Sequence, residues 1–115
     1  MSYDIIDTPS PILAVNWIRD NAVSLARAKA NRVYLEEFRK TKKALLMQEV
    51  AQKFPAFAAQ EREAYAHKEY QDLILGLKEA VEEEEKLKWQ MTAAMNKIEI
   101  WRTAESTKRA ELRAI

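Results

Sequence analysis

The chain has 115 residues, enough for one domain, and its formal net charge of +1 at pH 7 argues neither for nor against a nucleic-acid partner. It contains no cysteine, which excludes a disulfide framework and a thiolate metal site. With one glycine, three prolines and an abundance of strong helix formers, the composition predicts an all-α protein with long helices.

Residues 1–10 are expected to form a short lead-in to the first helix. Their letters, MSYDIIDTPS, hold no basic region followed by an apolar run, so we expect no signal peptide. No stretch of the chain approaches the roughly 20 apolar residues of a membrane span, so we expect no membrane partner. These features, together with the missing cysteine, favour a cytoplasmic protein.

The first helix is predicted over residues 11–54. Ser10 can act as its N-cap, and Pro11 fits the first helical position because the missing N–H would be unpaired there anyway. Pro55 ends the helix because its ring clashes with the preceding turn and restricts Phe54. The face expected to pack on another helix comprises Ile18, Ala22, Leu25 or Ala26, Ala30, Val33, Tyr34, Phe38, Leu45, Leu46, Val50 and Phe54.

Residues 55–68 are predicted to be a helical connector with a break near His67. His67 is the sole histidine, and Glu63 four residues earlier gives it half of a metal site at most. A connector histidine is the preferred interpretation, so we expect no metal and no other cofactor. A single glycine rules out a glycine-rich phosphate loop, and no serine has a histidine at a suggestive spacing, so we expect no enzyme activity.

The second helix is predicted over residues 69–112 and carries the clearest pattern in the chain. Apolar residues recur at alternating spacings of three and four, which is typical of a coiled-coil seam. The seam comprises Tyr70, Leu73, Leu77, Ala80, Leu87, Met91, Ala94, Ile98, Trp101 and Leu112, with Glu84, Glu105 and Lys108 as polar exceptions. Ile74, Val81 and Met95 widen it. Gly76, inside this helix, either admits another helix closely or marks a local weakness.

Two helices of similar length joined by a short connection predict a long antiparallel helical hairpin, which occupies residues 11–115 as a single domain. Folding about Gln60 and Glu61 predicts these neighbours: Lys43 and Glu79, Lys40 and Glu82, Arg39 and Glu83, Glu36 and Lys86. On this interpretation the acidic residues between Glu79 and Glu85 pair within the molecule and set the register of the helices.

The alternative is that basic residues of the first helix contact a phosphate backbone. The residues that would follow the phosphates along this helix are Lys29, Arg32, Arg39, Lys40, Lys42 and Lys43. The end of the second helix offers a further choice, because Arg102, Lys108, Arg109 and Arg113 accumulate there. These cations either complement the helix macrodipole or form a basic tip for a partner or for DNA.

Apolar residues also lie away from the seam of the second helix. Trp89 and Ile100 are eleven residues, or three helical turns, apart and therefore share a face, with Ala93 between them. Trp89 could lie flat beneath the stems of Lys86 and Lys88. The preferred interpretation is a second contact surface, because an exposed tryptophan beside an isoleucine is unfavourable in a monomer. We therefore expect a homo-oligomer that assembles as a helical bundle.

The strings EEFRKTKKALL and EREAYAHKEYQDLILGLKEAVEEEEKLKWQMTAAMNKIEIWRTAESTKRAE resemble small helical proteins of bacteriophages and prophages that are encoded near replication and recombination genes. The resemblance implies a non-catalytic accessory of phage DNA metabolism, located in the host cytoplasm, that binds single-stranded DNA or a phage or host recombination protein. The residues expected to contact DNA are Arg32, Arg39, Lys40, Lys43, Arg102, Lys108 and Arg109. The alternative is a protein-directed module without DNA binding, either a structural oligomer or an inhibitor of a host enzyme.

Overall fold

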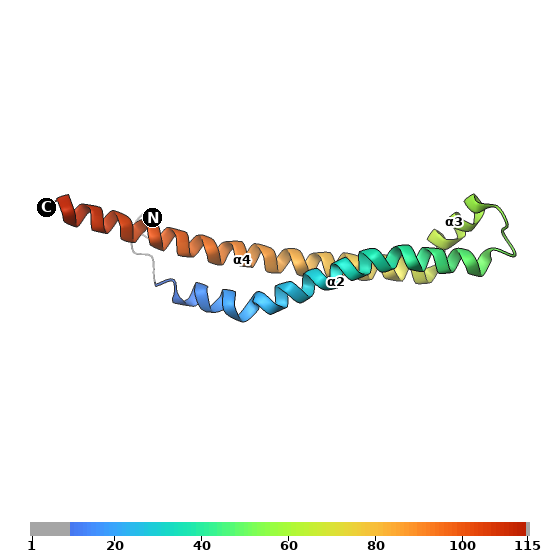
Figure 1. Cartoon of the computed structure of the whole chain (residues 1–115), viewed down its shortest axis with the longest axis horizontal. Helices are drawn as coiled ribbons and strands as arrows, with labels where there is room; N and C mark the ends of the chain where they lie inside the picture. The colour runs from blue at the N-terminus through green and yellow to red at the C-terminus, as the bar shows by residue number, and fades with distance from the viewer. Residues whose placement is uncertain (1–9, 115) are drawn as a thin grey trace. The chain divides into compact units, whose positions relative to one another are not determined.

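The computed structural model describes residues 10–114, so most of the expected lead-in lies outside the described residues. Within this range it contains three α-helices and no strand, which confirms the all-α class (Figure 1). The helices are α2 (Ile12–Val50), α3 (Phe57–Ala66) and α4 (Lys68–Ala114). None of the three combines the length and the apolar content needed to cross a membrane.

Helix α2 begins as the sequence predicts. The Oγ atom of Ser10 accepts a hydrogen bond from the N–H of Ile12 at 3.3 Å, and the carbonyl of Pro11 accepts one from the N–H of Val15 at 2.9 Å. The serine therefore satisfies one of the N–H groups that have no partner inside the helix.

Helix α2 ends at Val50, four residues before the predicted end at Phe54. The N–H of Ala51 bonds to the carbonyl of Gln48 at 3.3 Å, and the N–H of Phe54 bonds to the carbonyl of Val50 at 2.8 Å. Pro55 disfavours the helical conformation at the residue before it. The helix consequently loosens into a turn over its last residues rather than running up to the proline.

His67 separates α3 from α4, which confirms the predicted break. Its backbone is extended, with φ −67° and ψ 138°. The Nδ1 atom of His67 accepts a hydrogen bond from the N–H of Glu69 at 3.0 Å, so the histidine side chain caps the start of α4. Helix α4 begins at Lys68 and continues to Ala114, slightly beyond the predicted 69–112 at both ends.

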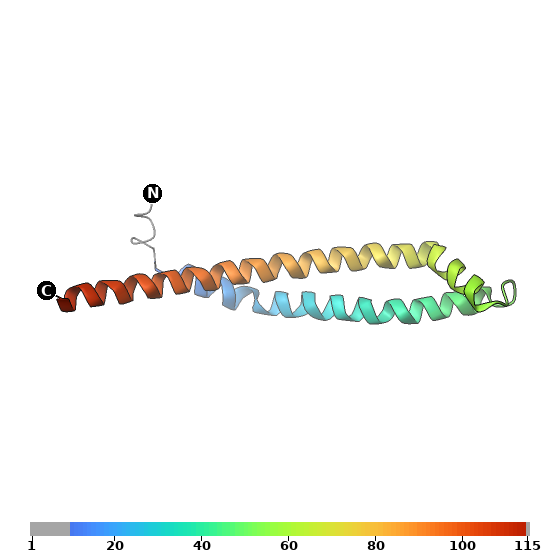
Figure 2. The same ribbon diagram turned by 90° about the horizontal axis from the view of Figure 1, so that it is seen from above.

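The chain divides into two compact units. The terminal unit comprises the described residues 10–25 and 86–114, and the connector unit comprises Ala26–Glu85. In each unit a segment of α2 runs antiparallel to a segment of α4, as the colours of Figures 1 and 2 show. The predicted helical hairpin is therefore confirmed as the arrangement within each unit.

The connector unit has a small apolar core where all three helices meet. Leu46 of α2, Ala64 of α3 and Tyr70 of α4 are buried together, and Met47 and Ile74 pack against them. Only 1% of the surface of Leu46 is exposed. Burial of a leucine side chain contributes about 1.5–3 kcal/mol, so this cluster anchors the α3 connection to both long helices.

The predicted seam of α4 is confirmed along most of its length. Its alanines, Tyr70 and Leu87 are buried, and the other apolar members up to Trp101 are partly buried. Leu112 departs from the pattern because 71% of its surface is exposed. Glu84, a polar exception on the seam, is itself buried, with 5% of its surface exposed.

The predicted packing face of α2 is only partly correct. The members that are indeed shielded, wholly or in part, are Ile18, Leu25, Phe38, Leu46, Val50 and Phe54. Exposed members of the predicted face are Ala22, Ala26, Ala30, Val33, Tyr34 and Leu45. The longest shielded row of α2 shares some residues with the predicted face and follows alternating spacings of four and three. It comprises Ala14, Ile18, Asn21, Leu25, Ala28, Arg32, Leu35, Arg39, Lys42 and Leu46. Polar residues on this face conceal it from a search for apolar periodicity.

The predicted register is wrong in the connector unit. Lys43 pairs with Glu61 of α3 instead of Glu79. Glu84 pairs with Arg32, whereas folding about Gln60 and Glu61 places it beside Phe38, six residues further along α2. The reason is that the connection is not a symmetric turn: α3 is a separate helix that packs on α2 through Ala64.

Candidate partner-binding surface and charged seam

An ion pair between the half-buried Arg32 and the buried Glu84 crosses the connector unit. The Nε and Nη2 atoms of Arg32 donate hydrogen bonds to the two carboxylate oxygens of Glu84 at 2.5 and 3.2 Å, which is a bidentate arrangement. The Nη1 atom of Arg32 also donates to Glu36, one turn along α2, at 3.0 Å. One guanidinium thus joins the two long helices at a fixed position.

This contact raises the pKa of Arg32, chiefly through the hydrogen bond to Glu84. The guanidinium is charged at every pH at which the protein would be studied, so Glu84 is compensated throughout. A buried carboxylate that lost this partner would be strongly unfavourable. The arrangement therefore selects one alignment of α2 and α4, because a shift of either helix separates the charges.

Lys42 and Lys43 are also engaged within the connector unit. The Nζ atom of Lys42 lies 3.3 Å from a carboxylate oxygen of Glu69. The Nζ atom of Lys43 donates to Glu61 at 2.7 Å and lies 4.7 Å from the centre of the Tyr65 ring. These contacts raise the pKa of Lys43, first through Glu61 and then through Tyr65.

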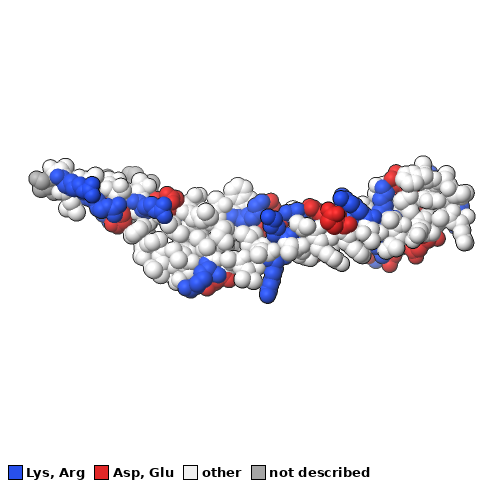
Figure 3. All heavy atoms as spheres, viewed as in Figure 1, with Lys and Arg blue, Asp and Glu red and all other residues white. Residues whose placement is uncertain are grey.

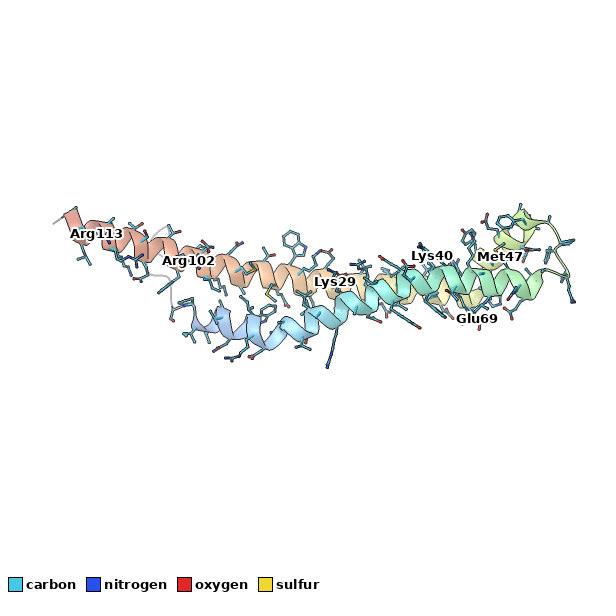
Figure 4. The ribbon with its side chains drawn as sticks, in the orientation of Figure 1. Lys29, Lys40, Met47, Glu69, Arg102 and Arg113 are labelled. Atoms are coloured by element: carbon cyan, nitrogen blue, oxygen red, sulfur yellow. The ribbon has the colours of Figure 1, made fainter. Side chains whose placement is uncertain are left out.

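The basic residues predicted to contact DNA do not form one open surface in the connector unit. Arg32 and Lys43 are turned to internal partners, with 24% and 26% of their side chains exposed. Arg39 is half-buried on the shielded face of α2. Lys40 is exposed and lies 3.5 Å from Glu37. Of this group, Lys40 is the member most open to solvent; its position on α2 is labelled in Figure 4, together with exposed Lys29.

The basic residues of the tip lie on the C-terminal part of α4 in the terminal unit. Arg102 pairs with Glu99 at 2.9 Å, and the Nζ atom of Lys108 lies 3.7 Å from a carboxylate oxygen of Glu105. Both contacts are between residues of α4. Figure 3 shows the blue atoms of this segment beside red ones. Within residues 10–114 no carboxylate pairs with Arg109. The tip is thus exposed, and its positive charge is partly compensated.

Trp89 and Ile100 are exposed in the terminal unit. The exposed fractions are 70% for Trp89 and 43% for Ile100, so the lysine stems near Trp89 cover little of it. Met95, on the same helix, is 55% exposed. Trp89 is the most exposed of these three side chains, and exposed apolar surface of this kind can mark an interaction site.

A groove of about 500 Å³ lies between α2 and α4 in the terminal unit. Leu13, Ala14 and Trp17 of α2 form one side of the groove, and Ser10 and Pro11 at the start of that helix also line it. Its α4 side is formed by Gln90, Ala93, Ala94 and Lys97. Alanines leave room between the larger side chains at the rims, which explains the hollow.

Three possible metal ligands approach one another near the end of α2. One donor atom from each of Glu49, His67 and Glu69 lies within 4.8 Å of the others. Glu63, which lies four residues before His67 in the sequence, is not one of these three residues. The Nδ1 atom of His67 already accepts the N–H of Glu69, and the Glu69 carboxylate faces Lys42. His67 therefore acts as a helix cap and Glu69 as the ion-pair partner of Lys42, and Glu49 is an exposed residue near them.

Three features escaped the sequence analysis for different reasons. The shielded face of α2 was missed because Arg32, Arg39 and Lys42 interrupt its apolar pattern. The groove was not predicted because Leu13 and Trp17, which form its α2 side, come before Ile18, the first residue of the predicted packing face. The capping role of His67 has no distinctive signal in the sequence. The ion pair of Glu84 does have one, because a glutamate at a seam position of α4 indicates a partner on the facing helix.

Comparison of the chain with protein-family models, with curated proteins and with solved structures found no match in any of the three.

Proposed function

We propose that this chain is a non-catalytic helical module of the cytoplasm that acts by binding other proteins, including further copies of itself. The observation that carries the proposal is the exposed apolar surface of the terminal unit at Trp89 and Ile100. Tryptophan is enriched among the residues that dominate binding energy at protein interfaces. Covering these side chains removes apolar surface from water and so favours association.

The charge distribution supports a protein partner over a nucleic acid. A phosphate-binding surface needs cations that are free to meet phosphates. Arg32, Lys42 and Lys43 have carboxylate partners within the connector unit, and the Arg32 contact is bidentate. These three cations therefore hold the helices of the connector unit together, whereas the apolar side chains of Trp89 and Ile100 are exposed in the terminal unit.

The proposal is tested by sedimentation velocity on the double variant Trp89→Gln, Ile100→Gln. We expect the parent to sediment as an oligomer at micromolar concentration and the double variant to shift to the 13.4 kDa monomer. Leu75→Gln is the matched control, because Leu75 is an apolar residue of α4 that is 58% exposed but lies in the connector unit. Equal effects of the two changes would contradict the proposal.

A second candidate function is that of an accessory in phage DNA metabolism that binds single-stranded DNA through the tip. The observation in its favour is that Arg102, Lys108 and Arg109 are all exposed and that Arg109 has no carboxylate partner in the described part of the chain. The resemblance to phage proteins points the same way. Contacts of this kind would be independent of base sequence and sensitive to salt.

A further inference from the structure

The last turns of α4 are exposed on every side. The groove residues place the start of α2 beside residues 90–97 of α4, and α4 then continues to Ala114. Every residue from Ser106 to Ala114 is exposed, although the seam of α4 runs through this segment, in which Arg113 is labelled in Figure 4. Most of the stability of a helix in a protein comes from the packing of one face. This segment is therefore suited to pack against a further helix.

The seam of this segment has a pattern that is symmetric about its middle. Between Trp101 and Leu112 the seam passes through Glu105 and Lys108, with spacings of four, three and four residues. The centre of the pattern lies between residues 106 and 107. When two such helices lie antiparallel about this centre, Trp101 of each copy faces Leu112 of the other, and Glu105 faces Lys108.

The seam charges favour the antiparallel orientation. In this orientation both central layers of the contact join a glutamate to a lysine, so opposite charges meet twice. In a parallel orientation Glu105 would face Glu105 and Lys108 would face Lys108, and like charges that face each other are unfavourable. The side chains of Lys108 and Glu105 are 49% and 33% exposed, so both can reach a second chain from their present positions.

One flank of the seam carries like charges. Arg102 and Arg109 of different copies come to lie on the same side of an antiparallel contact. Glu99 pairs with Arg102 at 2.9 Å and so compensates part of this charge. Both arginines are exposed, and interactions between exposed charges are weak and screened by salt. The pairing across the seam therefore decides the orientation.

We infer that the end of α4 binds the same segment of a second copy of this chain, antiparallel and about a two-fold axis between residues 106 and 107. The inference rests on the proposed function and names a surface of self-association separate from Trp89 and Ile100. Trp101 of each copy then covers Leu112 of the other, whose surface is 71% exposed in the single chain.

The test uses two variants whose seam charges in this segment have one sign. Glu105→Lys leaves both central positions basic, and Lys108→Glu leaves both acidic. Each variant alone brings like charges together across the contact, so we expect its self-association to be about tenfold weaker than that of the parent. An equimolar mixture of the two variants brings opposite charges together again and is expected to associate about as tightly as the parent. Sedimentation equilibrium measures the association, and circular dichroism checks that helicity is kept.

The mixture separates a contact between chains from a contact within one chain. Both variants lose the pair of Glu105 with Lys108 inside α4, so recovery on mixing can arise only between chains. Arg113→Glu is the matched control, because it makes the same change of charge at an exposed position of α4 that is off the seam. We expect the control to change association less than about twofold.

Three results in an associating parent would overturn the inference while leaving the proposed function standing. The first is a mixture that associates no more tightly than the separate variants. The second is a parent no tighter than either variant, which is the result of a parallel contact. The third is an equal effect of Arg113→Glu and Lys108→Glu. A parent that is monomeric throughout overturns both the inference and the proposed function.

Discussion

Arg32 shows how one residue can determine the alignment of two helices. Its guanidinium holds Glu84, which is buried on the seam of α4 at a position that an apolar residue would normally occupy. Such a pair contributes little net stability compared with apolar packing, but it makes other alignments unfavourable. The pair between Arg32 and Glu84 therefore determines how α2 and α4 align more than it adds to the free energy of unfolding.

We predict that Arg32→Ala lowers the Tm by roughly 10 °C, because it removes the two charge-assisted hydrogen bonds that Arg32 donates to the buried Glu84 carboxylate. Arg27→Ala is the control and is expected to change the Tm little, since Arg27 is exposed. The double change Arg32→Met, Glu84→Met is expected to recover most of the loss. A double variant less stable than Arg32→Ala in thermal melts would contradict the assigned role of the pair.

Gly76 is a site of local weakness within α4. A Cβ atom built on Gly76 meets no atom within 4 Å, so the glycine does not serve a close approach within the described chain. We predict that Gly76→Ala stabilises the fold by roughly 0.5–1 kcal/mol, because alanine has less conformational freedom to lose. Denaturant unfolding monitored by circular dichroism measures this. Destabilisation would show that the bare backbone of Gly76 is needed for contact with a partner helix.

At the scale of the element, the two long helices differ in how much the sequence reveals. Tyr70, Ala80 and Leu87 could be assigned to the buried side of α4 because apolar residues repeat there over many turns. For α2 the same search selected alanines such as Ala30, which are exposed, because Arg32 and Lys42 interrupt the true face. Charged residues that are shielded through specific partners cannot be recognised until those partners are known.

The assignment of the α2 face yields a matched comparison. Ala28 is half-buried on the shielded face and Ala30 is exposed, so the same substitution can be made at both. We predict that Ala30→Asn costs about 0.5–0.7 kcal/mol, which is the difference in helix propensity. Ala28→Asn is expected to cost roughly 1–2 kcal/mol more, because it also buries a polar amide. Denaturation midpoints in the reverse order would support the face predicted from the sequence.

At the scale of the whole molecule, the basic tip separates the two candidate functions. If the tip binds single-stranded DNA, changing Arg102, Lys108 and Arg109 to alanine should lower affinity about tenfold or more at low salt while helicity and mass stay unchanged. On the protein-directed account we expect no appreciable DNA binding by the parent, even at low salt. A mobility-shift titration at two salt concentrations makes the comparison, and binding that weakens steeply with salt would favour the DNA accessory.

The central claim is that apolar surface drives the chain to associate, and the mass of the parent protein in solution tests it most directly. Light scattering should be recorded across micromolar concentrations at about 0.1 M and about 1 M salt, since ionic contacts between exposed groups are screened at the higher value. We predict a mass of at least twice the monomer value of 13.4 kDa at both salt concentrations, because apolar association persists when charges are screened. A mass of 13.4 kDa over the whole concentration range would contradict the account.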